Sequence, residues 1–238
     1  MIVENKEFHS RICVDALENA KSVFSPLSSE EKQLLLEQMI AHEFKKGEVI
    51  YRVGEKPDGV LYLVHGKAKI AKAGIGGREQ IVRMAGVHSF IGYRALFAEE
   101  ESYASATTLE ETFLVQLPFE TVVSVIRSNS DFALALLKSF ATDLRFAENR
   151  TVTLTQKHIR GRLAESLLLL HKEYGVGDDE QTLQVLLSRE DVAKFSNMTP
   201  SNAIRTLSAF AQEGVIALEG RAIKILNIDE LERISRLG

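Results

Sequence analysis

Near the carboxyl end of the chain lies the run of polar side chains with the clearest chemical potential. Its sequence, residues 188–207, is SREDVAKFSNMTPSNAIRTL. Arg205 carries a planar guanidinium that can bond a guanine edge through two hydrogen bonds, a contact that supplies about 1–3 kcal/mol of base discrimination. Asn202 suits an adenine edge or a phosphate. These side chains fit contact with double-stranded DNA if a helix presents them on one face.

Two short helices joined by a tight turn are predicted to position these side chains. Ser188, with Asp191 three residues later, matches a capping box that starts the first helix. Asn197 tolerates the left-handed backbone that a tight turn needs. Thr199 can cap the second helix, and Pro200 suits its first position. The pattern predicts a helix-turn-helix whose second helix enters the major groove. The side chains presented there are Thr199, Pro200, Ser201, Asn202 and Arg205.

Two short apolar segments around EGR follow the second helix and predict a β-hairpin wing. We expect Arg221 at its tip, together with Arg189, to contact the DNA backbone. Residues 156–238 contain 11 Lys and Arg against 12 Asp and Glu. DNA binding must therefore depend on a small local cluster of cations rather than on overall charge. A plain helical hairpin with a solvated arginine is the alternative interpretation of this segment.

A single long helix is predicted over residues 131–155. Apolar side chains recur in it at alternating steps of four and three, the spacing of a helix that packs against a partner along its length. Six of the seven positions are apolar, and they are Ala133, Leu137, Phe140, Leu144, Ala147, Thr151 and Leu154. A two-fold homodimer contact is expected there, made by Leu137, Phe140, Leu144, Ala147 and Leu154. The alternative is that the stripe packs against the protein's own β domain.

Short β-branched and aromatic segments separated by glycines occupy residues 43–117. This pattern predicts antiparallel strands in a β-barrel or jelly roll, preceded by a capped helix within SPLSSEEKQLLLEQM. The chain is therefore predicted to be an α+β protein with three parts. These are a β-barrel domain with N-terminal helices (1–130), a dimerisation helix (131–155) and a winged helix-turn-helix domain (156–238).

Composition and motifs exclude several classes of protein. The 238 residues have a net charge of −4 and contain no 18-residue apolar run, so no membrane-spanning segment is expected. The N-terminus lacks the apolar core of a signal peptide, which favours a cytoplasmic protein. Cys13 is the single cysteine and cannot supply a disulfide framework or a four-cysteine iron–sulfur or zinc site. No GxSxG, HExxH, P-loop or GxGxxG motif occurs, so we expect neither enzymatic activity nor a metal site.

The order of barrel, long helix and winged helix-turn-helix resembles the Crp/Fnr family of bacterial transcription regulators. The resemblance covers essentially the whole chain and is carried by FKKGEVIYRVGEKPDGVLYLVHGKAKI, FIGYRALF and SREDVAKFSNMTPSNAIRTL. It implies a homodimer on a palindromic operator with half-sites about 34 Å apart, RNA polymerase as a partner, and a small-molecule effector sensed by the barrel. The effector pocket is then predicted to contain Gly92, Tyr93, Arg94, Ala95, Leu96, Phe97, Tyr103 and Ala104.

Departures from the family pattern narrow the effector and the operator. Members that bind cyclic AMP use a Glu for the ribose and an Arg-Ser pair for the cyclic phosphate. Here Tyr93 stands at the Glu position, and Tyr103 with Ala104 stand at the Arg-Ser positions. Tyrosine cannot replace a bidentate cation, so we predict that cyclic AMP is not the effector, with Arg94 as the alternative phosphate partner. Ser201 replaces the usual acidic base-reading residue, which predicts an operator unlike the common family half-site.

Two alternatives to an unidentified small-molecule effector stay open. Some family members bind haem through histidine, although the six histidines here show no HxxxH or similar ligand spacing. The regulator can also be independent of any effector, with a barrel that serves only dimerisation and polymerase contact. A ligand-induced rise in thermal stability distinguishes a sensor from such a structural barrel.

Overall fold

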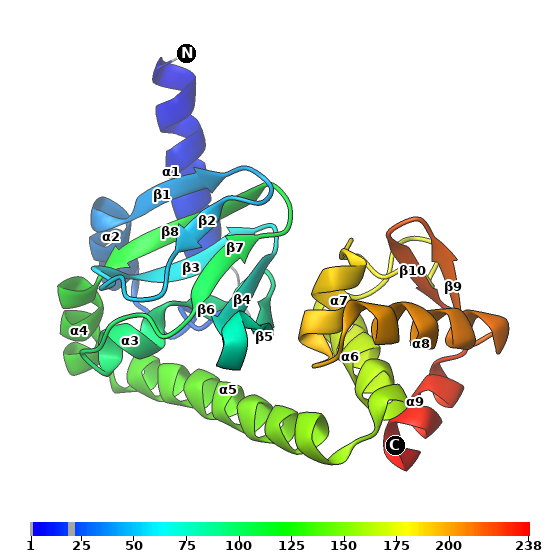
Figure 1. Cartoon of the computed structure of the whole chain (residues 1–238). Helices are drawn as coiled ribbons and strands as arrows, with labels where there is room; N and C mark the ends of the chain where they lie inside the picture. Colours follow the sequence, from blue (N-terminus) through cyan, green and yellow to red (C-terminus); the bar gives the residue numbers. More distant parts are fainter. Residues whose placement is uncertain (1, 19–21) are drawn as a thin grey trace. The chain divides into compact units, whose positions relative to one another are not determined.

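The computed structural model of the chain describes residues 2–18 and 22–238 (Figure 1). It contains two compact units. The first comprises the chain up to Lys72 together with Ala85–Arg145, and the second comprises Ala73–Met84 together with Phe146–Gly238. The long helix α5 (Ser130–Gln156) contributes residues to both units, and each unit is described by itself below.

Two four-stranded sheets provide the strands predicted for the β domain. Their strand orders are β1-β8-β3-β6 and β2-β7-β4-β5, and the pairs β1–β8, β3–β8, β2–β7 and β4–β7 are antiparallel. The strands are β1 (Ile40–Phe44), β2 (Val49–Tyr51), β3 (Gly59–His65), β4 (Ala68–Ala73), β5 (Glu79–Ala85), β6 (Phe90–Ile91), β7 (Ser105–Thr108) and β8 (Thr112–Pro118), with a 3-10 turn at Ile75–Gly77. The expected antiparallel domain is confirmed, and its strands form two sheets that do not close into one barrel.

Helices α1 (Ile2–Glu18), α2 (Ser29–Gln38) and α4 (Phe119–Ser128) cover strands of the first sheet. The core between them is aromatic. The ring of Phe24 lies 5.0 Å from that of Tyr62 and 6.0 Å from that of Phe132 at the start of α5, and all three side chains are almost fully buried. Ser28 and Glu31 form a capping box at the start of α2, which confirms the helix predicted before the strands.

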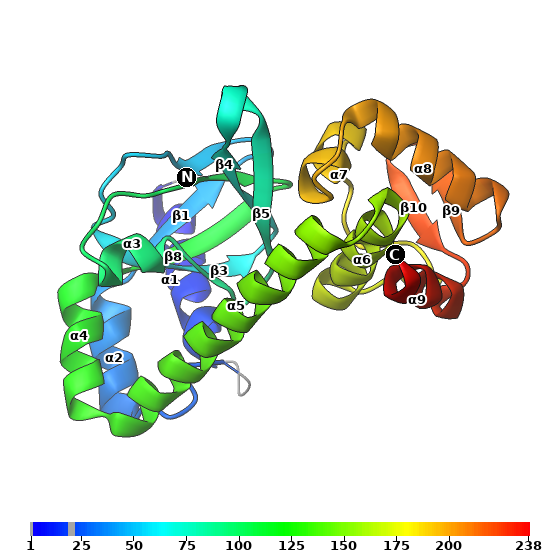
Figure 2. The ribbon, with the colours of Figure 1, turned by 60° about the horizontal axis from the view of Figure 1, so that its bottom comes forward.

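Helix α5 is continuous over 27 residues (Figure 2). Its apolar side chains divide into a buried group and an exposed group. Phe132 and Leu136 are 1% and 4% exposed and belong to the core of the first unit. Leu134, Leu137 and Leu144 point to solvent and are 62%, 62% and 60% exposed. The helix therefore packs against its own domain on one side and leaves a row of leucines uncovered on another.

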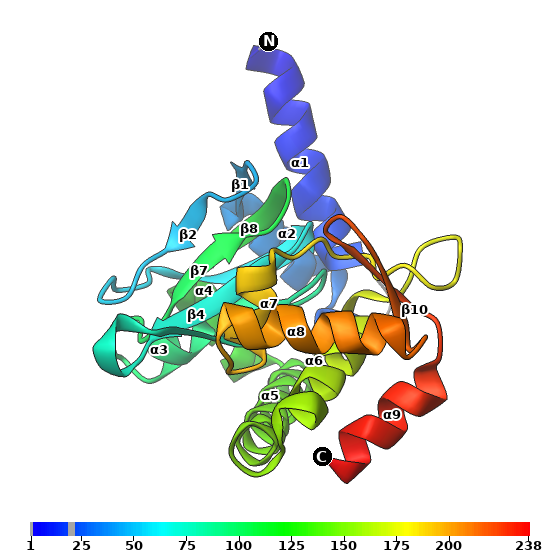
Figure 3. The same ribbon diagram turned by 45° about the vertical axis from the view of Figure 1, so that its right-hand side comes forward.

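The C-terminal elements form a winged helix-turn-helix, as predicted. They are α6 (Ile159–Tyr174), α7 (Arg189–Phe195), α8 (Pro200–Gln212), β9 (Ile216–Glu219), β10 (Ala222–Ile225) and α9 (Ile228–Leu237). Figure 3 shows α8 lying across α6, with the β9–β10 hairpin behind it. Leu167, Phe195, Phe210 and Leu231 are fully buried at the centre of these elements. No helix among residues 2–18 and 22–238 is long and apolar enough to cross a bilayer.

Candidate functional site

Local sequence fixes the start of both helices of the helix-turn-helix. The Ser188 hydroxyl accepts a hydrogen bond from the Asp191 backbone N–H at 3.0 Å and caps α7. Asn197, in the turn, has a left-handed backbone with φ of 50°. Thr199 caps α8 by accepting from the Asn202 backbone N–H, and Pro200 occupies the first turn. These predicted caps are confirmed, and they hold the two helices at a fixed turn.

Burial divides α8 into a core face and a solvent face. Ala203, Leu207 and Phe210 are at most 1% exposed and pack into the unit. The solvent face carries the remaining side chains that a groove would meet. They are Pro200, Ser201, Ile204, Arg205 and Ser208. The structure thus brings four of the five predicted α8-end residues to solvent, Thr199, Pro200, Ser201 and Arg205, while Asn202 is half-buried.

Arg205 and Asn202 act as a pair on this face. A guanidinium nitrogen of Arg205 donates to the Asn202 side-chain oxygen. A guanidinium has five N–H donors, so this bond orients the group and leaves donors for a base edge. Sequence reasoning missed Ile204, which is 50% exposed although it is a large branched apolar side chain. Its position beside Arg205 in the sequence of a capped helix was the available signal.

The wing lies against the first helix of the motif. Arg189 donates to the Gly220 backbone oxygen at 2.6 Å and so ties the start of α7 to the hairpin tip, where Arg221 is exposed. Lys224, on β10, forms ion pairs with Glu219 at 2.8 Å and Asp179 at 3.7 Å, and the Glu219 hydrogen bond raises the pKa of Lys224. Arg205 and Arg221 are therefore the exposed cations of α8 and the hairpin tip, whereas Lys224 is held by two carboxylates.

In the first unit, the predicted effector residues cluster around helix α3 (Tyr93–Phe97). Gly92 starts the helix with a left-handed φ of 74°. The Tyr93 ring stacks on Phe140 of α5 with centroids 4.3 Å apart, and its hydroxyl donates to Asp143 at 2.6 Å. Burial and then the Asp143 hydrogen bond raise the pKa of Tyr93 to about 12. Tyr93 is thus a neutral donor that fastens α3 to α5.

The remaining predicted effector residues lie beside this junction. Arg94 donates from Nη1 to the Tyr103 hydroxyl at 2.9 Å and from Nε to the Tyr93 hydroxyl at 3.4 Å. Phe97 is partly exposed and meets the Phe140 ring edge-on. The last three residues of the set are buried, namely Ala95, Leu96 and Ala104. The only positive charge in the predicted set is therefore engaged by two phenol groups.

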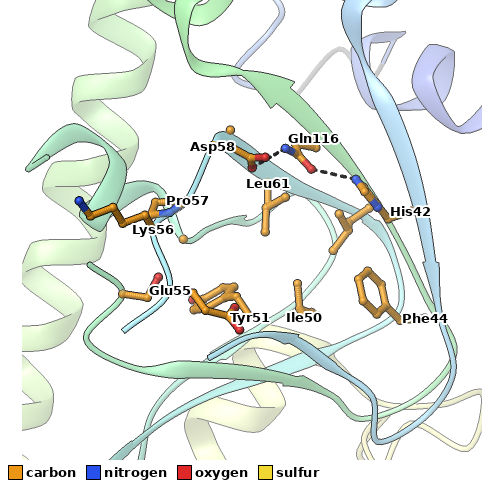
Figure 4. Close-up of a pocket in the computed structure, with 14 residues that line it drawn as sticks. His42, Phe44, Ile50, Tyr51, Glu55, Lys56, Pro57, Asp58, Leu61 and Gln116 are labelled. Carbon is orange, nitrogen blue, oxygen red and sulfur yellow. Dashed lines mark hydrogen bonds between the residues drawn. The ribbon is translucent and has the colours of Figure 1, made fainter. Parts of the chain in front are cut away.

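A cavity of about 200 Å³ lies in the first unit, next to these residues (Figure 4). Its lining comprises His42, Phe44, Ile50, Tyr51, Glu55, Lys56, Pro57, Asp58, Gly59, Leu61, Gly92, Ser102, Leu114 and Gln116. Of the eight predicted effector residues, Gly92 alone is among them. Sequence reasoning missed the others because they come from separate strands and loops, and the available signal was a polar residue inside a strand, His42 or Gln116.

The predicted dimer residues differ in their surroundings. Leu137 and Leu144 are exposed on the open face of α5. Phe140 lies between that face and the first unit's own core, because its ring stacks on Tyr93. Ala147 and Leu154 are half-buried. Leu134, which the heptad prediction omitted, is as exposed as Leu137 and extends the row.

Comparison with known proteins agrees with this architecture. Residues 41–129 match the profile of the Cyclic nucleotide-binding domain, and residues 161–234 match the Crp-like helix-turn-helix domain. The "CRP-like cAMP-activated global transcriptional regulator" of Mycobacterium tuberculosis is 28% identical over 204 residues, which cover 85% of this chain and 91% of that protein. The "Cyclic AMP receptor protein" of Thermus thermophilus is 27% identical over 213 residues, 90% of this chain and 96% of that protein.

Solved structures show the same fold. FixK2 from Bradyrhizobium japonicum has a TM-score of 0.74 at 22% identity and covers 82% of this chain and 96% of its own. A β domain of the cyclic nucleotide-binding type followed by a Crp-like helix-turn-helix defines a DNA-binding transcription regulator. The chain belongs to the Crp/Fnr family.

Proposed function

We propose that this regulator binds a palindromic operator as a homodimer through α8, with Arg205 reading a base and Arg221 contacting the backbone. The observation that carries the proposal is the solvent face of α8, where Arg205 and its partner Asn202 stand at the capped start of the helix. A two-fold dimer presents two such helices, which suits half-sites about one DNA turn apart. Contact with chromosomal DNA and RNA polymerase requires a cytoplasmic protein.

The dimer contact in this proposal is the row of exposed leucines on α5. Leu134, Leu137 and Leu144 occur at steps of three and seven residues, and each is at least 60% exposed. Burial of a leucine stabilises an association by about 1.5–3 kcal/mol. An isologous helix pair covers the row on both subunits at once.

The experiment that tests the proposed function is selection of duplexes from a random DNA library by the full-length protein, followed by gel-shift titration. We expect recovery of an inverted repeat that the protein binds with at least about a thousandfold preference over random duplex. Enrichment of a single unrepeated site would contradict the dimeric arrangement. No enrichment at all would contradict sequence-specific binding.

Effector control is proposed to act through the α3–α5 junction. Tyr93 links α3 to Phe140 and Asp143 of α5, so a ligand that displaces α3 also changes the packing of the dimer helix. A ligand that binds one arrangement of α3 and α5 more tightly shifts the population toward that arrangement. It then changes operator affinity by the same factor by which the operator changes the affinity for the ligand.

Cyclic AMP is proposed not to be that ligand. Two relatives carry cyclic AMP in their names, but here the nearby cation, Arg94, is bonded to Tyr93 and Tyr103. Two of the five guanidinium N–H donors are thus already engaged, so a cyclic phosphate would have to compete with the phenols for a bidentate pair of charge-assisted bonds. Calorimetry at micromolar cyclic AMP is expected to show no heat of binding, whereas a low-micromolar Kd would contradict this part of the proposal.

A further inference from the structure

The cavity between the strands of the first unit contains a chain of polar side chains among apolar ones. His42 Nε2 lies 2.9 Å from Gln116 Oε1, and Gln116 Nε2 donates to Asp58 Oδ1 at 2.7 Å. Because a carboxylate only accepts, the amide nitrogen of Gln116 must face Asp58, and its oxygen must face His42. His42 therefore carries its proton on Nε2. The three residues form a directed chain that ends on a carboxylate.

Backbone packing makes room for this chain. Gly59 is buried at the start of β3, and a Cβ atom there would lie 2.7 Å from the Leu117 carbonyl oxygen and 2.8 Å from Gln116 Cγ. Such approaches exclude any side chain at this position without displacement of β8. The glycine next to Asp58 thus allows Gln116 to reach the carboxylate. The polar chain therefore runs from His42 and Gln116, which are half-buried, to the carboxylate of Asp58, which is exposed at the rim of the cavity.

The opposite side of the cavity is apolar and aromatic. Figure 4 shows Tyr51, Ile50 and Phe44 across from the polar chain, with Leu61 between. A site with one polar edge and aromatic walls suits a small planar ring that carries a hydrogen-bonding group at one end. The volume of about 200 Å³ limits the ligand to one small ring system.

Charge decides which hydrogen-bonding group fits. The lining contains two carboxylates, Glu55 and Asp58, against one ammonium, Lys56. Figure 4 shows the Lys56 ammonium turned away from the polar chain. Glu55 accepts from the Arg52 backbone N–H at 2.8 Å and is held in the loop. A carboxylate has about four acceptor positions, so Asp58 can accept from Gln116 and from a ligand donor together.

We infer that this cavity binds a small aromatic ligand that bears a cationic or neutral N–H donor, directed at Asp58, and that it discriminates against aromatic anions. The inference deepens the proposed regulator function, on which it rests, by naming the chemical class of the effector. A charge-assisted hydrogen bond contributes roughly twice as much as a neutral one. An anion of the same shape would instead meet the Asp58 carboxylate.

Three probes of almost identical shape test the inference: benzamidine, benzamide and benzoate, which carry charges of +1, 0 and −1. Ligand-observed NMR titrations of the full-length protein would measure the Kd of each. We expect benzamidine to bind at least about tenfold more tightly than benzoate, with benzamide between them. Equal affinities, tighter binding of benzoate, or no binding of any probe would overturn the inference.

Matched variants of the same loop locate the effect. Asp58→Asn keeps an acceptor for Gln116 and removes the charge, so it should abolish the preference for benzamidine while leaving benzamide binding within about threefold. Lys56→Ala should leave the order of the three probes unchanged. The opposite result would be that the wild-type protein binds benzoate more tightly than benzamidine and that Lys56→Ala abolishes benzoate binding. The cavity would then be an anion site. Melting temperatures of both variants check that the fold persists.

Gel shifts on the selected operator separate this inference from the proposed function. A protein that binds the operator but none of the probes disproves the ligand class alone. A protein that binds benzamidine through Asp58 but enriches no DNA sequence disproves the operator proposal alone.

Discussion

The DNA-reading face and the cavity of the first unit are built in opposite ways. The DNA-reading face is the solvent face of α8 described above, with Pro200, Ser201, Ile204, Arg205 and Ser208. The DNA-reading face comes from nearby residues of one capped helix and projects into solvent, and its Arg205 is hydrogen-bonded to the amide oxygen of Asn202. The cavity is lined by residues from β1, β2, β3, β8 and the loops between them, and its lining has more carboxylates than ammonium groups.

On α8, the side chains available to DNA are not the side chains that stabilise the fold. Side chains on the solvent face of α8 contribute little to the core, because Ala203, Leu207 and Phe210 do that work from the other side of the helix. Beside the cavity and on α3, Gly59 and Tyr93 are buried and take part in the packing of the first unit. Substitutions on the DNA-reading face should therefore change affinity alone, whereas substitutions near α3 should change stability as well.

We expect the largest loss of operator affinity from substitutions on α5, which belongs neither to the DNA-reading face nor to the cavity. The proposed contact should bury six leucines per dimer, and Leu137→Asp combined with Leu144→Asp replaces four of them with carboxylates. Because each leucine contributes about 1.5–3 kcal/mol, dimer affinity should fall at least about a thousandfold. Sedimentation equilibrium measures this directly, and operator binding should fall in parallel.

A matched control is Leu237→Asp, which changes another exposed leucine, on α9, at 75% exposure. It should leave the dimer intact. A double α5 variant that is still dimeric would place the dimer contact elsewhere on the molecule.

Arg205→Ala should have the next largest effect and sharpen the contrast between affinity and stability. Loss of a bidentate base contact costs about 1–3 kcal/mol in each half-site, or roughly 5- to 150-fold in affinity per half-site. Base preference at one operator position should relax, while the melting temperature should stay within about 1 °C because Arg205 is exposed. Gel shifts and differential scanning calorimetry measure the two quantities.

Arg236→Ala serves as the charge-matched control, since Arg236 is exposed on α9 and forms an ion pair with Glu232 at 3.6 Å. It should reduce operator affinity much less. Equal losses in the two variants would mean that Arg205 contributes general charge rather than base reading.

The contrast also explains what the sequence could predict. The caps at Ser188 and Thr199, and the turn at Asn197, are set by interactions between residues at most three apart, so their spacing in the sequence was enough. The fold class followed from the same kind of local pattern. A half-buried Phe140 was less predictable, since one helical stripe had to choose between a partner and its own domain.

The cavity could not be predicted because its polar chain spans 74 residues between His42 and Gln116. The alternation of side chains along a strand does not predict which strands pair or which polar side chain lines the cavity. The resemblance to the family directed attention to Gly92 and Tyr93 instead. Only the pairing of β1 and β3 with β8 brings His42, Asp58 and Gln116 together.

Tyr93→Phe should have the opposite effect to Arg205→Ala, because it should lower stability more than operator affinity. Loss of a hydrogen bond to a carboxylate costs about 1.5–3 kcal/mol of stability when the site is largely buried. Folding raises the pKa of Tyr93 to about 12 from an ordinary value of 10, so its neutral form stabilises the native state below pH 10 and that contribution disappears as the pH rises through 12. The variant should lack this alkaline component.

Urea titrations of the wild-type protein and of Tyr93→Phe, from pH 8 upward, measure the difference in their free energies of unfolding at each pH. An unchanged free energy of unfolding at pH 8 would contradict the structural role of this bond, and operator affinity without effector should change less than stability does.

The smallest effect tests whether an apolar residue on the DNA-reading face reads sequence. Ile204 is 50% exposed beside Arg205, and the exposed groups that a branched apolar side chain matches in the major groove are thymine methyls. Burial of one methyl is worth about 0.8 kcal/mol, so replacing the contacted thymine by uracil should weaken wild-type binding about fourfold per half-site. Ile204→Ala should bind both duplexes equally, whereas Ser208→Ala, on the same solvent face, should keep the wild-type difference. Gel-shift titrations with thymines replaced one at a time measure the interaction. If no thymine-to-uracil change is sensed by the wild-type protein, Ile204 does not read sequence, and base discrimination on this helix belongs to its polar side chains alone.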